Sequence, residues 1–215
     1  MTAHEHTVAL TARPRAVRRA VILNRVTLGY NAAEAVIALT AGVLAGSISL
    51  VGFGLDSVVE VSASLVLMWR LAAERRDGCT QETDARATKA VALSFAALAG
   101  YVGIEAFRQL LSGDAPDGSP VGITLTALSL AVMPFLARAK RRVAPALGSR
   151  AQVAEANQTA LCALMSAVVL VGLAANAMRG WWWADPIAGL SIAALAAIEA
   201  ARTWRAESLE DTCCA

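Results

Sequence analysis

The sequence predicts an all-α, polytopic membrane protein with six transmembrane helices. The chain has 215 residues, of which 57% are hydrophobic and only 17% are charged, whereas an average soluble domain is roughly 25% charged. The apolar residues form six long runs, and about 20 mostly apolar residues are enough to cross a bilayer as a helix. These runs are rich in Ala and Leu and lack the period-two alternation of membrane strands, so we expect helices.

The predicted helices occupy most of the chain. Their ranges are about 20–43, 48–71, 88–111, 120–138, 153–178 and 182–203. We therefore expect an N-terminal tail at 1–19, one six-helix transmembrane domain at 20–203, and a short C-terminal tail at 204–215. The first run is expected to be a retained helix and not a signal peptide, because polar side chains interrupt it and no small-residue cleavage site follows it.

Turn signals separate the six runs. They lie at Gly42–Ser47, in the charged stretch Ala73–Ala87, in SGDAPDGSP at 112–120, in the basic stretch Lys140–Arg150, and at Arg179–Gly180. The dipeptide Asp185–Pro186 is typical of an N-cap followed by proline in the first helical turn, which predicts the start of the sixth regular helix.

Basic residues are concentrated on one side of the predicted membrane. They occupy the N-terminal tail, the second and fourth connections and the C-terminal tail, while the opposite side has only Arg108 and Arg179. By the positive-inside rule, both termini are expected in the cytoplasm. The net charge of +2 hides this asymmetry and gives no reason to expect nucleic-acid binding.

Three of the predicted helices carry a stripe of polar residues at steps of three or four, which places each stripe on one helix face. The stripes are Asn24, Thr27, Asn31 and Glu34 on the first helix, Asp56, Glu60 and Ser64 on the second, and Glu155, Gln158, Cys162 and Ser166 on the fifth. We expect these faces to turn toward one another and away from lipid.

Two pairs of these side chains reach the membrane midplane. At about 1.5 Å per residue, Asp56, Glu60, Gln158 and Cys162 all approach the middle of a hydrocarbon core about 30 Å thick. Two carboxylates, an amide oxygen and a thiolate can surround a divalent cation, which cancels the charge that makes the acids costly in lipid. Zinc accepts this mixed set, and the sulfur disfavours Mg²⁺ and Ca²⁺. We predict these four residues as metal ligands.

Other polar residues of the stripes are candidates for the ion pathway. Glu155 is a candidate entry ligand, Glu34 an exit or gating group, and Asn31 a pathway residue that also suits a hydrogen bond between helices. The alternatives are structural: Asp56 and Glu60 as a protonated pair, Gln158 as an interhelical hydrogen-bonding group, and Cys162 as a small buried apolar residue.

Small residues and the remaining cysteines suggest further contacts. Two rows of small residues allow close helix packing, within one chain or in a homodimer, and they are Gly189, Ala193, Ala197 and Ala201, and Ala92, Ala96 and Gly100. Cytoplasmic side chains that could capture soft metals are His4, His6, Cys79, Cys213 and Cys214, although their spacing matches no metal-binding motif.

Two stretches resemble the cation diffusion facilitator family of six-helix divalent metal transporters. They are AGSISLVGFGLDSVVE at 45–60 and ADPIAGLSIA at 184–193, and the resemblance extends over most of 20–203. Asp56 and Glu60 match the family's metal-binding positions on its second helix. The glycine–phenylalanine stretch before them is similar to a bacterial branch related to a vertebrate vesicular zinc transporter.

The sequence departs from the family in two places. The family usually carries His or Asp and then Asp on its fifth helix, where this chain has Gln158 and Cys162. The cytoplasmic C-terminal domain usual in the family is not expected, because only a short tail follows the sixth run.

The resemblance implies a secondary transporter, not an enzyme, in a bacterial inner (plasma) membrane. It would export a divalent transition metal in exchange for protons, Zn²⁺ first and Cd²⁺, Co²⁺, Fe²⁺ or Mn²⁺ as alternatives, without a prosthetic group. Three alternative functions are an exporter of organic cations, a metal-binding scaffold without transport, and a membrane enzyme with Cys162 as nucleophile. The enzyme would lack a histidine base, since neither His lies in a predicted membrane helix.

Overall fold

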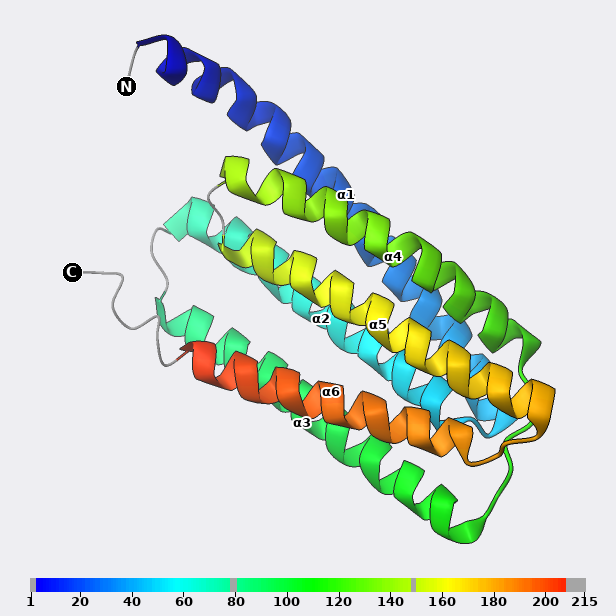
Figure 1. Cartoon of the computed structure of the whole chain (residues 1–215). Helices are drawn as coiled ribbons and strands as arrows, with labels where there is room; N and C mark the ends of the chain where they lie inside the picture. The colour runs from blue at the N-terminus through cyan, green and yellow to red at the C-terminus, as the bar shows by residue number, and fades with distance from the viewer. Residues whose placement is uncertain (1–2, 78–80, 148–149, 208–215) are drawn as a thin grey trace.

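A computed structural model describes residues 3–77, 81–147 and 150–207, with side chains described over 18–62, 64–65, 89–143 and 156–205. These residues form six α-helices and no strand (Figure 1). The helices are α1 (Ala3–Ala45), α2 (Ile48–Asp77), α3 (Gln81–Ser112), α4 (Pro120–Leu147), α5 (Arg150–Arg179) and α6 (Ala184–Glu207). Helix α1 begins and α6 ends at the same end of the bundle, which we call the terminal end.

Helices α2 and α5 occupy the centre of the bundle. Helix α2 packs against α1, α3, α5 and α6, and α5 packs against α4, α6 and α2. Helices α1 and α4 lie on one side of this central pair, and α3 lies with α6 on the other (Figure 1). The two helices with the predicted metal ligands therefore pack against each other and against helices on both sides.

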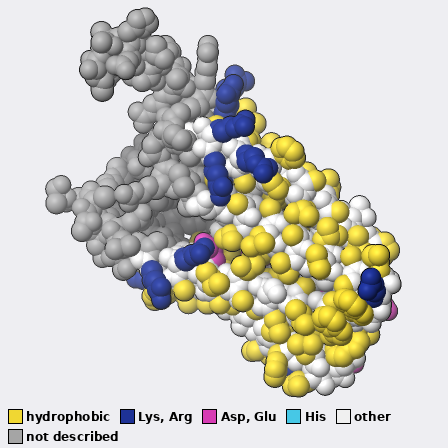
Figure 2. All heavy atoms as spheres, viewed as in Figure 1, with side chains coloured by type: hydrophobic (Ala, Val, Ile, Leu, Met, Phe, Trp, Pro, Cys, Tyr) yellow, Lys and Arg dark blue, Asp and Glu magenta, His cyan; other side chains and the backbone are white. Residues whose placement is uncertain are grey.

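The outer surface is that of a membrane protein. Five helices, α1 and α3 to α6, contain a described stretch long and apolar enough to cross a bilayer. Side chains of α2 are described without interruption only over 48–62, which is too short to qualify, so the sixth span stays a prediction. Hydrophobic side chains cover most of the described face in Figure 2, and Lys and Arg gather toward the terminal end. The chain is an integral membrane protein.

The helices are longer than the apolar runs that predicted them. Helix α2 ends at Asp77, α3 begins at Gln81 and α4 ends at Leu147, so the predicted connections Ala73–Ala87 and Lys140–Arg150 are mostly helical. The connections were predicted too long because their Ala, Arg, Lys and Glu residues are good helix formers, which continue a helix beyond its apolar part.

Close approach of α1 and α2 depends on glycine. A Cβ at Gly42 would lie 2.8 Å from the backbone nitrogen of Val51, and one at Gly54 would lie 2.9 Å from that of Leu39. The predicted turn beginning at Gly42 is wrong in extent, because α1 continues to Ala45 and the chain reverses at Gly46, where φ is 64°. Without a Cβ, glycine adopts this left-handed conformation at little cost.

Part of one small-residue row packs within the chain. Gly189 and Ala193 are buried, and a Cβ at Gly189 would lie 3.2 Å from Cβ of Ala106 on α3. Ala197 and Ala201 are exposed at the far end of the same row. Packing between α3 and α6 thus accounts for the first half of the row, and a homodimer through the exposed half stays a prediction.

Asp185 joins the beginnings of two helices. The predicted N-cap role is wrong, because α6 begins at Ala184 and the Asp185 carboxylate accepts hydrogen bonds from the hydroxyls of Ser47, at 2.6 Å, and Ser49. The Ser47 hydroxyl in turn accepts from the backbone N–H of Leu50 at 3.2 Å and so caps α2. A buried anion between two helix N-termini is also favoured by both helix dipoles.

Replacing Asp185 with alanine should destabilise the bundle. Loss of a buried, hydrogen-bonded carboxylate costs about 3 kcal/mol, which corresponds to a fall of about 6–12 °C in the thermal midpoint of a chain this size. Thermal unfolding of the purified protein in detergent measures this. Glu105→Ala is the matched control, because Glu105 pairs with Arg108 on the exposed surface at 3.0 Å. Equal midpoints for the two variants would contradict the role given to Asp185.

Candidate metal site

The polar stripes of α1, α2 and α5 face the interior, as the spacing predicted. The described members that are buried are Thr27, Asn31, Glu34, Asp56, Glu60, Cys162 and Ser166. Ser64 and Gln158 are half-buried. The side chain of Glu155 lies outside the described residues. The spacing of three and four residues on three helices therefore places three carboxyl groups, an amide and a thiol inside the bundle.

Asp56, Glu60 and Cys162 form a compact cluster. One carboxylate oxygen of each acid and the sulfur of Cys162 all lie within 4.8 Å of one another. In a tetrahedral zinc site with ordinary bond lengths, ligand atoms are separated by roughly 3.4–3.8 Å. A contraction of about 1 Å, within reach of side-chain rotation, would bring the three atoms to the separations of a zinc site.

The buried acids have oxygen atoms without hydrogen-bond partners. Among the described residues, these atoms include Oδ1 of Asp56, Oε1 of Glu60 and Oε1 of Glu34. Buried polar atoms are normally paired, and a carboxylate inside a membrane bundle is especially costly. A bound cation would offset that cost, so the donor set fits a divalent metal as cargo.

Glu34 adds a third carboxyl group to the cluster. Its Oε2 accepts a hydrogen bond from the hydroxyl of Ser57 at 2.9 Å and lies 3.8 Å from the sulfur of Cys162. Ser129 of α4 also lies close to Glu34. The sequence predicted an exit or gating role for Glu34, and the structure places its side chain beside Cys162 in the interior.

Asn31 links α1 to the cluster. Its amide nitrogen donates a hydrogen bond to Oε2 of Glu60, which confirms the predicted bond between helices. The bond leaves Oε1 of Glu60 without a partner, so Asn31 fixes one oxygen and leaves the other for a ligand. Asn31 is therefore placed to orient Glu60.

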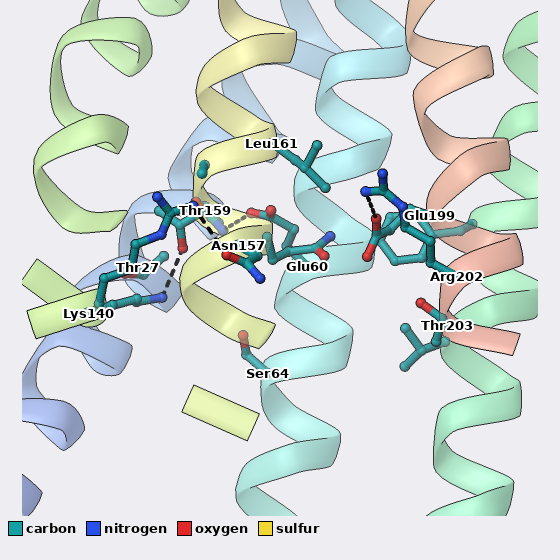
Figure 3. A pocket seen from close by; sticks show the side chains of 16 residues that line it. Thr27, Glu60, Ser64, Lys140, Asn157, Thr159, Leu161, Glu199, Arg202 and Thr203 are labelled. Atoms are coloured by element: carbon teal, nitrogen blue, oxygen red, sulfur yellow. Dashed lines mark hydrogen bonds and ion pairs between the residues drawn. The ribbon is translucent and has the colours of Figure 1, made fainter. Parts of the chain in front are cut away.

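A cavity of about 540 Å³ lies toward the terminal end and reaches Glu60. Figure 3 shows the side chains that line it. All six helices line it, and α3 to α6 do so with residues from the half nearest that end. The lining residues include Asn31, Glu60, Ser64, Lys140, Gln158 and Glu199. Gln158, a predicted ligand, lies on this lining one helical turn before Cys162. Of the clustered side chains, Glu60 is the one that lines the cavity, so a cation entering there would meet Glu60 first.

The sequence-based prediction missed Lys140 in this cavity. It was assigned to a basic connection, but it lies in α4, is fully buried, and donates a hydrogen bond from Nζ to Oγ1 of Thr159 at 3.1 Å. A signal was present, because Met133, Ala137 and Lys140 are spaced by four and three and all three are buried. Helical periodicity could thus have placed Lys140 on the inner face of α4.

The side chains predicted to capture soft metals on the cytoplasmic side all lie outside the described set. Cys79, Cys213 and Cys214 lie outside the described residues. His4 and His6 belong to α1, but their side chains are outside the described set.

The fold and the cluster define a polytopic membrane protein with buried groups suited to a cation. The family model of the cation efflux transmembrane domain matches residues 25–209. The chain therefore belongs to the cation diffusion facilitator family and is a membrane transporter of metal cations. No curated protein shows significant sequence similarity to the chain.

Asp56→Asn and Glu60→Gln should each abolish zinc binding without unfolding the protein. Each change keeps the side-chain size and removes a buried charge, so the metal-free thermal midpoint should stay equal or rise. Wild type should gain about 2.7 kcal/mol at a zinc concentration 100 times Kd, and both variants should lose this gain. Thermal unfolding with and without zinc measures it.

The control for this experiment is Glu105→Gln, which removes an exposed acid near the opposite end of the bundle. This variant should keep the zinc-dependent gain in full. A normal gain in both Asp56→Asn and Glu60→Gln would place the metal elsewhere.

Proposed function

We propose that this protein exports Zn²⁺ across a bacterial inner membrane in exchange for protons. The observation that carries the proposal is the group of Asp56, Glu60 and Cys162, whose ligand atoms lie within 4.8 Å of one another beside a cavity. Two carboxylates and a thiol favour a borderline-soft transition metal over Mg²⁺ or Ca²⁺. The zinc-transporting branch suggested by the sequence is part of this proposal.

Each side chain near the cluster has a proposed role. Asp56, Glu60 and Cys162 bind the cation, with Gln158 as a fourth ligand reached from the cavity. Glu34, which lies beside Cys162, accepts the cation as it leaves toward the other end. Glu155 precedes Gln158 by three residues on α5 and serves as an entry ligand.

The cavity supports an inward-open conformation. It lies at the terminal end, toward which the Lys and Arg side chains gather in Figure 2. The positive-inside rule assigns that end, with both termini, to the cytoplasm. Cytoplasmic zinc would enter this cavity, and rocking of the helices around the cluster would then expose it to the opposite side.

Carboxylate ligands support coupling to protons. A carboxyl group must lose its proton to bind a metal, so metal and protons compete for the same oxygens. Three buried carboxyl groups, those of Glu34, Asp56 and Glu60, are available for this competition. Protons that occupy them after zinc has left would return inward with the protein.

Zinc flux and proton movement should therefore be coupled in proteoliposomes. An inward-directed proton gradient should accelerate outward zinc movement, and an imposed zinc gradient should move protons in the opposite direction. A zinc-sensitive dye and a pH-sensitive dye measure the two fluxes, with Asp56→Asn as the inactive control.

The outcomes separate the possible functions. Zinc flux without proton movement, in vesicles shown to be tight to protons, would contradict exchange and indicate a uniporter. Zinc binding without flux would indicate a scaffold. Proton-coupled flux of an organic cation in place of zinc would indicate the alternative cargo.

Cys162→Asp should change the metal preference. The substitution supplies the acid that the family usually has at this position and replaces a soft ligand with a hard one. We expect the ratio of Mn²⁺ to Cd²⁺ flux to rise about tenfold, which is about 1.4 kcal/mol. Cys213→Ser, which changes a cysteine of the C-terminal tail, should leave the ratio unchanged. An unchanged ratio in Cys162→Asp would remove this thiol from the metal site.

A further inference from the structure

A buried lysine lies in the cavity proposed to admit a cation. Lys140 of α4 is 0% exposed and lines the same cavity as Glu60 of α2. Its ammonium group donates to the hydroxyl of Thr159 on α5 and is close enough to Glu60 for its charge to act on that carboxylate. Figure 3 shows Lys140 of α4 and Glu60 of α2 among the side chains that line the cavity.

The position of Lys140 differs from that of the neighbouring basic residue. Arg141 also lines the cavity, but its side chain is exposed and donates to Oδ1 of Asn157 at 3.2 Å. Water and ions screen such an exposed charge, whereas a buried charge acts on its neighbours through a lower dielectric. Lys140 and Arg141 thus provide a buried and an exposed positive charge in one cavity.

We propose that Lys140 is a tethered cation that lowers the affinity of the site for the transported metal. Its ammonium group stabilises Glu60 in the metal-free protein and repels the entering divalent cation. Metal binding therefore has to overcome this charge, and the cation is bound weakly enough to be passed on. The inference rests on the proposed function and assigns a residue that sets cargo affinity.

A merely structural lysine would behave differently. If Lys140 served only to join α4 to α5 through Thr159, its removal would loosen the bundle and weaken metal binding or leave it unchanged. A tethered cation predicts the opposite sign, because removal of a positive charge near the site strengthens attraction for another cation.

The test measures zinc affinity of the full-length protein in detergent by isothermal titration calorimetry. Lys140→Gln removes the charge and keeps a hydrogen-bond donor on the side chain. We expect Kd for zinc to fall about tenfold or more. Lys140→Arg, which keeps the charge, and Arg141→Gln, which removes the exposed one, should each stay within about threefold of wild type.

Transport kinetics provide a second readout. Lys140→Gln should show zinc flux with a lower KM and a lower kcat, because tighter binding slows release. A weaker or unchanged zinc Kd in folded Lys140→Gln would overturn the proposal. If Lys140→Gln does not fold, Lys140→Met is measured instead, and failure of both to fold would assign Lys140 a structural role and also overturn it.

The same titrations separate this inference from the proposed function. Absence of zinc binding in wild type, or normal binding in Asp56→Asn and Glu60→Gln, would contradict the metal site itself. Loss of binding in those two variants, together with unchanged affinity in Lys140→Gln, would contradict only the role of Lys140.

Discussion

The charge of three carboxyl groups buried inside a membrane bundle is the constraint on which the rest of this structure depends. Glu34, Asp56 and Glu60 are each less than 5% exposed, far from the water that would solvate them. Such groups persist in a membrane protein only when other charges or hydrogen bonds compensate them. The structure supplies the hydroxyl of Ser57 and the amide of Asn31, and it leaves one oxygen of each acid without a described partner. The central position of α2, shielded by four other helices, follows from the same need.

Buried polar groups have different roles at the two ends of the bundle. At the end with the α1–α2 turn, the carboxylate of Asp185 accepts hydrogen bonds from Ser47 and Ser49 and ties the beginning of α6 to that of α2. At the terminal end, polar side chains from all six helices line a cavity that reaches Glu60. A route to Glu60 from the terminal end suits a transporter whose site is reached from one side at a time.

Hydropathy and helical periodicity predicted much of this arrangement, because both are local properties of the chain. They placed six helices, turned three polar stripes inward, and selected Asp56 and Glu60 from their spacing of four. They did not place the helix ends, since charged helix-forming residues continue α2, α3 and α4 beyond their apolar runs. They also could not show that Asp185 meets Ser49, that Glu34 meets Cys162, or that Lys140 is buried. Those contacts join residues on different helices, and they depend on how each helix is rotated against its neighbours.

The central claim is that the transported cation binds between α2 and α5, and the position of a bound metal tests it most directly. Crystals of the zinc-loaded protein, measured on both sides of the zinc absorption edge, would locate the ion by anomalous difference density. The account predicts a peak within bonding distance of Asp56 and Glu60, about 2.0–2.2 Å from oxygen and about 2.3 Å from the sulfur of Cys162. A fully occupied zinc peak elsewhere in the protein, with none between these side chains, would contradict it.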